Sequence, residues 1–155
     1  MTTGPDPGER RLARPPSERY ETTPSDAQDE TVPGSAGRAI AWGAVAAGVG
    51  ALLTVLLGGV VAISVGLLVV WASVGNAVGL ATRVGGGTAL PAPRRTWLAV
   101  GLALVGVAVG QVGLWGYAAS EGGVLPLVEY LATTFGVLVP LQALLAVGAA
   151  WWAAR

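Results

Sequence analysis

The sequence contains no cysteine, no histidine and no lysine. Without cysteine the chain can form no disulfide, thiolate metal site, iron–sulfur cluster or cysteine nucleophile. Without histidine it also lacks the commonest metal ligand and proton carrier near neutral pH. We therefore expect no metal site and no bound cofactor. All nine basic residues are arginines, which, with the abundance of Ala, Gly and Val, indicates a GC-rich prokaryotic genome.

Charge is scarce and unevenly placed. Only 12% of the residues are charged and 53% are hydrophobic, whereas soluble domains contain about 25% charged residues. Seven of the nine acidic and five of the nine basic residues lie in the first 38 positions. The rest is too apolar to be soluble alone, so the sequence predicts an integral membrane protein embedded in the lipid bilayer. The net charge of zero argues against nucleic acid as a partner.

Residues 1–37 are rich in Pro, Gly, Ser, Thr and mixed charges and contain almost no large apolar side chains. Such a segment buries too little surface to offset its ordering entropy, so we expect a disordered tail. It has no apolar core of the kind that a signal peptide needs. Within it, the stretch RYETTPSDAQDE resembles sites that bacterial Ser/Thr kinases phosphorylate, which makes Thr22 and Thr23 candidate phosphorylation sites.

Four apolar stretches follow, over 39–57, 60–81, 96–119 and 133–154. Each is close to the ~20 residues that cross a membrane as a helix. A single helix over 39–81 would run about 65 Å, twice the bilayer core, so we expect a tight turn at Gly58-Gly59. None of the stretches shows the alternation of a membrane barrel. The predicted fold is all-α: a four-transmembrane-helix bundle of two antiparallel hairpins behind a disordered N-terminal tail.

The arginines predict the orientation. With four spans and the N-terminus inside, all nine lie on the cytoplasmic side, as the positive-inside rule requires. A three-span arrangement would separate Arg94 and Arg95 from Arg38, so we disfavour it. We therefore expect a multi-pass protein of the cytoplasmic membrane with both termini cytoplasmic. Most aromatic residues fit two interfacial belts, and Trp71, which does not, is expected to pack between helices.

Glu121 and Glu129 are the only acidic residues after position 30. They fall in the predicted outer loop, where a short interfacial helix is expected with Pro126 in its first turn. We expect both carboxylates to stay ionised in the headgroup layer. The alternative is an entry point for a cation or proton.

Small residues recur at helical spacing within the spans. Gly106, Gly110 and Gly113 belong to a seam that begins at Ala99, and Gly75 and Gly79 form a second GxxxG unit. Such seams let membrane helices approach closely. The third and fourth stretches both carry one, which favours their packing as a hairpin. Self-association through a remaining seam is the alternative.

Three amides interrupt the apolar stretches. Gln111 and Gln142 lie at similar depth on consecutive antiparallel helices, so we predict an interhelical hydrogen bond between them. The alternative is a polar site for a ligand in the outer third of the membrane. Asn76 is placed near the inner end of its span, where it would cap or bridge helices.

For function, the spans contain no charged residue and no combination of groups for acid–base or nucleophilic catalysis, so we expect no enzyme and no catalytic residue. The connector 82–95 has a Gly triplet but lacks the Lys and Ser/Thr of a phosphate-binding loop. Two classes remain. The first is a non-catalytic scaffold or accessory subunit that binds other membrane proteins or itself. The alternative is an oligomeric small-solute or ion transporter or channel, lined by Gln111, Gln142 and the outer glutamates.

Overall fold

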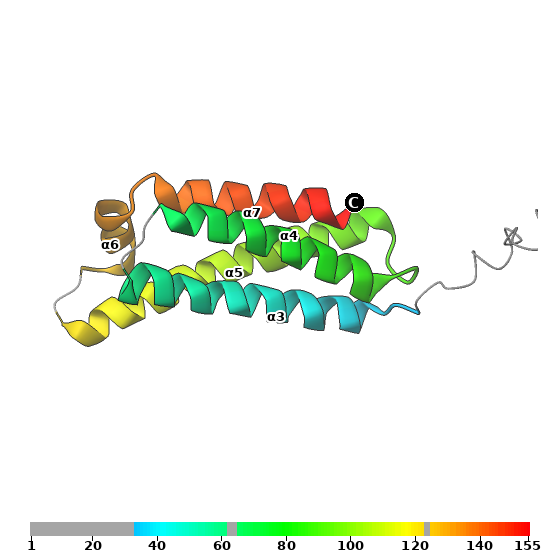
Figure 1. Ribbon diagram of the computed structural model, residues 1–155, viewed down its shortest axis with the longest axis horizontal. Helices are drawn as coiled ribbons and strands as arrows, with labels where there is room; N and C mark the ends of the chain where they lie inside the picture. The colour runs from blue at the N-terminus through cyan, green and yellow to red at the C-terminus, as the bar shows by residue number, and fades with distance from the viewer. Residues whose placement is uncertain (1–32, 62–64, 123–124) are drawn as a thin grey trace, which may run out of the picture. The chain divides into compact units, whose positions relative to one another are not determined.

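The computed structural model describes residues 33–61, 65–122 and 125–155 (Figure 1). Every regular element in these ranges is helical, which confirms the predicted all-helical character. In chain order the elements are α3 (Ala36–Thr54), η1 (Val55–Val60), α4 (Gly66–Gly86), α5 (Ala92–Glu121), α6 (Leu127–Thr134) and α7 (Leu138–Ala154). The predicted tail up to residue 32, with Thr22 and Thr23, lies outside the described ranges.

The four long helices α3, α4, α5 and α7 lie side by side (Figure 1). Helix α3 packs against α4 and α5, and α7 packs against the same two helices. The start of α3 and the end of α4 meet where the Ser35 amide donates to the Gly85 carbonyl (3.0 Å). The start of α5 and the end of α7 meet where Arg95 Nε donates to the Ala154 carbonyl (2.8 Å). Successive long helices therefore run in opposite directions.

Three helical segments are long and apolar enough to cross a membrane: Ala36–Val60, Gly66–Gly86 and Ala92–Glu121. A fourth crossing exists if α6 and α7, which meet at an angle of 91°, are taken as one bent span. Alone, α7 has 17 residues, about 25 Å of helix. The described residues thus hold three to four candidate membrane spans.

The first turn does not lie at Gly58-Gly59. Both glycines belong to the π-helical segment η1, which continues α3 to Val60, and α4 begins at Gly66. A Cβ built on Gly59 would lie 2.9 Å from Tyr117 Cδ1, and one on Gly58 would lie 3.1 Å from Leu67 Cδ1. The glycines therefore let η1 approach side chains of α4 and α5, and this close packing extends the helix beyond the predicted turn.

The connector between α4 and α5 is also shorter than predicted, covering 87–91 rather than 82–95. Helix α4 continues to Gly86 because its last turn packs on the start of α3, where a Cβ on Gly85 would lie 2.8 Å from Ala39 Cα. Helix α5 begins at Ala92, with Pro93 in the first turn, a position that needs no backbone N–H donor.

The fourth apolar stretch is not one helix from 133 to 154. Thr133 and Thr134 end α6, and α7 begins only at Leu138. Gly136, with φ 50°, provides the break, and the Leu131 carbonyl accepts from the amides of both Phe135 and Gly136 (3.0 Å each). The predicted short helix is present as α6, but Pro126 precedes it instead of lying in its first turn.

The main core consists almost entirely of Ala and Val, with Trp71 as its only large side chain. Trp71 is fully buried, so it packs between helices as expected. A second, smaller cluster of Leu67, Leu114 and Phe135 lies where α6 meets the long helices. Small core residues allow the backbones to approach closely, because contact between backbones replaces large interdigitating side chains.

Candidate functional site

The amides of Gln111 and Gln142 meet in the interior. Gln111 Nε2 donates to Gln142 Oε1 at 2.6 Å, across the contact of α5 with α7. Gln111 is 4% exposed and Gln142 is fully buried. The sequence places the two residues at similar depth on antiparallel helices, and the packing of α5 on α7 brings them together. This hydrogen bond links two helices through side chains that are almost completely buried.

The pair leaves one acceptor and one donor without a partner, Gln111 Oε1 and Gln142 Nε2. Two primary amides joined by a single bond always leave such a remainder. An apolar cavity of about 350 Å³ adjoins Gln111 among aliphatic side chains of α5, α6 and α7. The unpaired oxygen itself is inaccessible, and the one hydrogen bond of the pair joins α5 to α7.

The glycines make the closest helix contacts. A Cβ on Gly75 would overlap the carbonyl oxygen of Ala146, and one on Gly79 would lie 2.6 Å from that of Ala150. Helices α4 and α7 thus meet along GxxxG against AxxxA. A side chain at either glycine would force the two backbones apart.

The glycines of α5 face a helix other than the predicted one. A Cβ on Gly106 would lie 2.9 Å from Ala47 Cβ, and one on Gly113 would lie 3.0 Å from Val55 Cγ2. Gly110 gives room to Trp71, whose Cζ2 would lie 3.1 Å from its Cβ. The α5 glycines therefore meet α3, η1 and α4 instead of α7. Glycine spacing reveals a smooth helix face, but it does not reveal which neighbour covers that face.

Asn76 does not lie near the inner end of its span, where the sequence analysis placed it. It is the central residue of α4, ten positions from each end, and it neither caps the helix nor bridges to another one. The prediction failed because α4 extends five residues beyond residue 81. The Asn76 side chain is exposed. Among the Ser, Thr, Asn and Gln side chains of the four long helices, it alone makes no hydrogen bond to another described residue.

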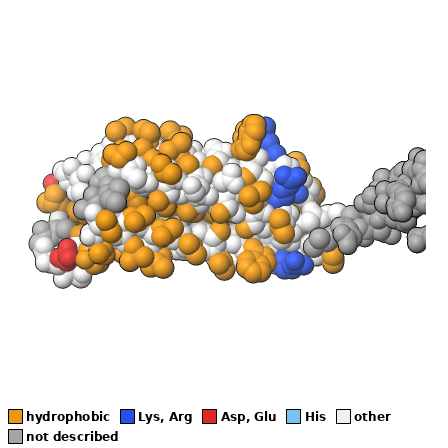
Figure 2. Space-filling model, in the orientation of Figure 1, with side chains coloured by type: hydrophobic (Ala, Val, Ile, Leu, Met, Phe, Trp, Pro, Cys, Tyr) orange, Lys and Arg blue, Asp and Glu red, His pale blue; other side chains and the backbone are white. Residues whose placement is uncertain are grey.

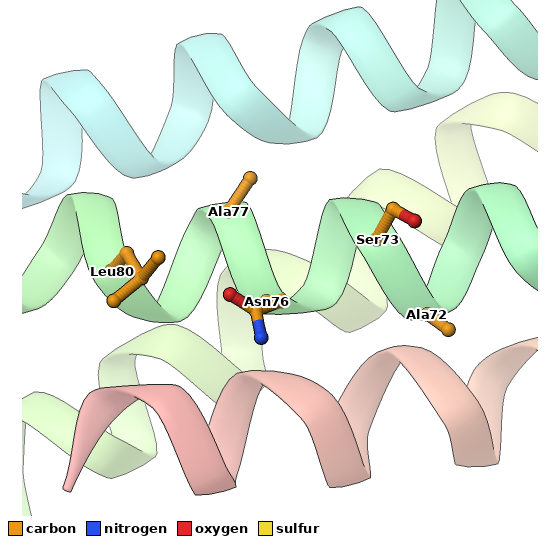
Figure 3. A pocket seen from close by; sticks show the side chains of 5 residues that line it. All are labelled: Ala72, Ser73, Asn76, Ala77 and Leu80. Atoms are coloured by element: carbon orange, nitrogen blue, oxygen red, sulfur yellow. The ribbon is translucent and has the colours of Figure 1, made fainter.

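Around Asn76 the outer surface of α4 is hollowed. A shallow groove of about 470 Å³ is lined by α4 alone, through Ala72, Ser73, Asn76, Ala77 and Leu80. We call these five residues the α4 face. In Figure 3 the face lies between the ribbons of α3 and α7, which flank α4 on either side. The Ser73 hydroxyl donates to the Val69 carbonyl of its own helix (2.9 Å), which leaves the Asn76 amide as the free polar group of the groove.

Sequence reasoning missed the α4 face. Ser73 and Ala77 form a small-xxx-small pair of the kind found at membrane helix contacts, with Asn76 beside it. This pattern can be read from the sequence, but the neighbouring GxxxG pair of Gly75 and Gly79 is a stronger indication of helix contact. The two pairs lie on different sides of α4, since Gly75 and Gly79 are buried against α7 while Ser73 and Ala77 are exposed.

The two ends of the described structure carry opposite charge (Figure 2). Arg38, Arg83, Arg94, Arg95 and Arg155 lie at the end where α3 and α5 begin and where α4 and α7 finish. There Arg95 donates to the backbone oxygens of Ala154 (2.8 Å) and Arg155 (2.9 Å), which ties α5 to the end of α7.

The acidic residues occupy the opposite end. Glu121 is the last residue of α5 and accepts a hydrogen bond from the Tyr117 hydroxyl (3.1 Å). Glu129 lies in the first turn of α6, where a negative charge is favoured by the helix dipole. Both are exposed. Within the described ranges, no three His, Cys, Asp or Glu side chains are grouped so that they could hold a metal ion.

No protein-family model, curated protein or solved structure matches this chain. The candidate site is therefore identified from its geometry alone. It is the α4 face, with the exposed amide of Asn76 at the centre of an apolar helix.

Proposed function

We propose that this chain is a non-catalytic scaffold or accessory subunit of the prokaryotic cytoplasmic membrane, and that it acts through helix–helix contacts. In this proposal the four long helices form a transmembrane bundle with both termini on the cytoplasmic side. The gathering of the arginines at one end supports this orientation (Figure 2). The 17-residue α7 completes its crossing with α6 lying in the outer interface.

The proposal is based on the exposed side chain of Asn76 at the centre of α4. At the centre of α4 its amide is about 15 Å from either end of the helix. When α4 spans the membrane, this position lies in the middle of the hydrocarbon core. An amide without a hydrogen bond costs roughly 1–3 kcal/mol in an apolar environment. A partner helix that covers the α4 face and bonds to Asn76 removes this cost. Ser73 and Ala77 give that helix room to approach.

The other amides and the buried hydroxyls of the spans each make a hydrogen bond between described residues. Gln111 and Gln142 bond to each other, and the buried hydroxyls of Thr54, Thr82 and Thr96 donate to backbone carbonyls of their own helices. This arrangement favours a subunit that binds over an enzyme. It also gives less support to the transporter alternative, since that function needs Gln111 and Gln142 to line a path for solutes.

Site-specific photocrosslinking in native membranes tests the proposal. A photoreactive amino acid at Ala77, on the α4 face, is expected to give a discrete protein adduct. Val105 provides the matched control, because it is 60% exposed near the middle of α5, across the bundle from the α4 face. The proposal is wrong if Ala77 yields no more protein adduct than Val105.

A further inference from the structure

We infer that the partner of the α4 face is a second copy of this chain, bound in a parallel two-fold dimer with the two Asn76 amides hydrogen-bonded to each other. This inference depends on the docking role proposed above for the α4 face. It identifies the occupant, which that proposal leaves open.

Symmetry supports the pairing. Two copies inserted with the same orientation can be related by a two-fold axis only along the membrane normal. Identical residues then lie at the same depth in both copies. Because Asn76 is exposed on the α4 face, packing one α4 face on another brings the two amides together. A different protein would need a hydrogen-bonding group of its own at this depth, facing the same way.

Asparagine is chemically suited to such a contact. Its side chain carries an NH₂ donor and a carbonyl acceptor, so two symmetry-related amides can each donate to the other. Two carboxylates or two ammonium groups would repel each other in the same position. The reciprocal bonds satisfy the one Ser, Thr, Asn or Gln side chain of the long helices that makes no hydrogen bond to another described residue.

The shape of the α4 face permits close approach. Ala72, Ser73 and Ala77 are small, and the Ser73 hydroxyl is already bonded to its own helix. The amides can therefore meet without being held apart by neighbouring side chains. Leu80 lies one turn beyond Asn76 on the same face and is 47% exposed, so it supplies apolar contact next to the amide pair.

The absence of cysteine makes a direct test possible, since each introduced cysteine is the only one in the chain. We would place single cysteines at Ser73→Cys, Ala77→Cys and Leu80→Cys in the full-length chain and oxidise native membranes. A disulfide requires Cα atoms within about 7 Å, so it forms only where two copies meet. We expect dimers of twice the 15.5-kDa monomer at positions on the face. The control variant Val105→Cys should stay monomeric.

A second measurement tests the amide itself. The dimer dissociation constant of the full-length chain in detergent, followed by energy transfer between labelled copies, should rise about tenfold for Asn76→Leu, the effect of two interhelical hydrogen bonds. Asn76→Gln keeps the amide and should recover most of the affinity. Leucine is well tolerated on a lipid-facing surface, so loss of folding should not obscure the result.

The outcomes separate the two proposals. Equal dimerisation of Asn76→Leu and the parent chain, or equal disulfide yields at Val105 and on the α4 face, would overturn the dimer. If Ala77 photocrosslinks to a different protein while no cysteine on the α4 face forms a disulfide, the α4 face is a docking surface for that protein. A second copy of this chain is then excluded as its partner. If Ala77 gives neither product, both proposals fail.

Discussion

Replacing Gln111 with leucine removes one half of a buried amide pair and leaves the other half without a partner. The Gln111–Gln142 bond is 2.6 Å long, and its two residues are 4% and 0% exposed. The Gln142 amide would then have no water or lipid headgroup within reach. An unsatisfied buried polar group costs about 1–3 kcal/mol, so we expect a loss of about 1.5 kcal/mol in the free energy of unfolding.

The double variant, with leucine at both Gln111 and Gln142, shows whether the two losses of stability are coupled. Hydrogen bonds between membrane helices contribute about 0.6 kcal/mol on average and up to about 1.7. This bond is short and fully enclosed, so we expect a coupling energy of about 1 kcal/mol. If Gln142→Leu also costs about 1.5 kcal/mol, the double variant should lose about 2 kcal/mol instead of about 3, because leucines replace both amides and no polar atom stays unsatisfied.

Reversible unfolding in mixed micelles, followed by helical circular dichroism, measures all four free energies. Thr82→Val serves as the matched control, because Thr82 is buried and bonded to Gly79 of its own helix (2.9 Å), towards the other end of the bundle. When Thr82→Val is combined with Gln111→Leu, the loss in the free energy of unfolding should equal the sum of the two single losses within about 0.3–0.5 kcal/mol. Additive losses for Gln111 and Gln142 as well would refute the reasoning, since the bond would then contribute nothing to stability.

Two further predictions concern the close helix contact and the orientation. Gly75→Ala should destabilise the fold by about 1–3 kcal/mol, because its Cβ would overlap the backbone of α7. Gly101→Ala, where a Cβ meets nothing within 4 Å, should instead be neutral or stabilise by up to about 1 kcal/mol in the same unfolding assay. For orientation, Thr88→Cys in the α4–α5 connector should react with an impermeant maleimide only after the membrane is opened, whereas Ser120→Cys at the end of α5 should react in intact cells. The opposite pattern would reverse the proposed topology.

Local sequence was sufficient for some features and insufficient for others. The pairing of Gln111 with Gln142 could be predicted because each is a polar residue within one of two consecutive antiparallel apolar helices. The equal distances from the loop that the prediction used do not hold, since Gln111 lies ten residues before the end of α5 and Gln142 four residues after the start of α7. The turn at Gly58-Gly59 could not, because glycine suits both a reversal and a close helix contact. Only the side chains of Leu67 and Tyr117, which lie near these glycines in space, distinguish the two.

The bend between α6 and α7 illustrates the same limit. The stretch 133–154 is apolar throughout, and composition alone makes it look like one span. The break at Gly136 depends on its positive φ and on the second cluster, in which Phe135 packs with Leu67 of α4 and Leu114 of α5. These contacts join residues distant in the sequence.

The sequence by itself determined the helical, apolar character of the chain and the separation of its charges, because both follow from the length of the apolar runs and the order of the arginines and glutamates. Only the tertiary structure decided which side of each helix faces inward. Asn76 and Gln111 are both amides within apolar helices, yet Gln111 is buried with a partner and Asn76 is exposed without one. Helices that are apolar on every side carry no signal of their own rotation. That rotation is set by contacts with neighbouring helices, and it is what makes α4 the candidate docking surface.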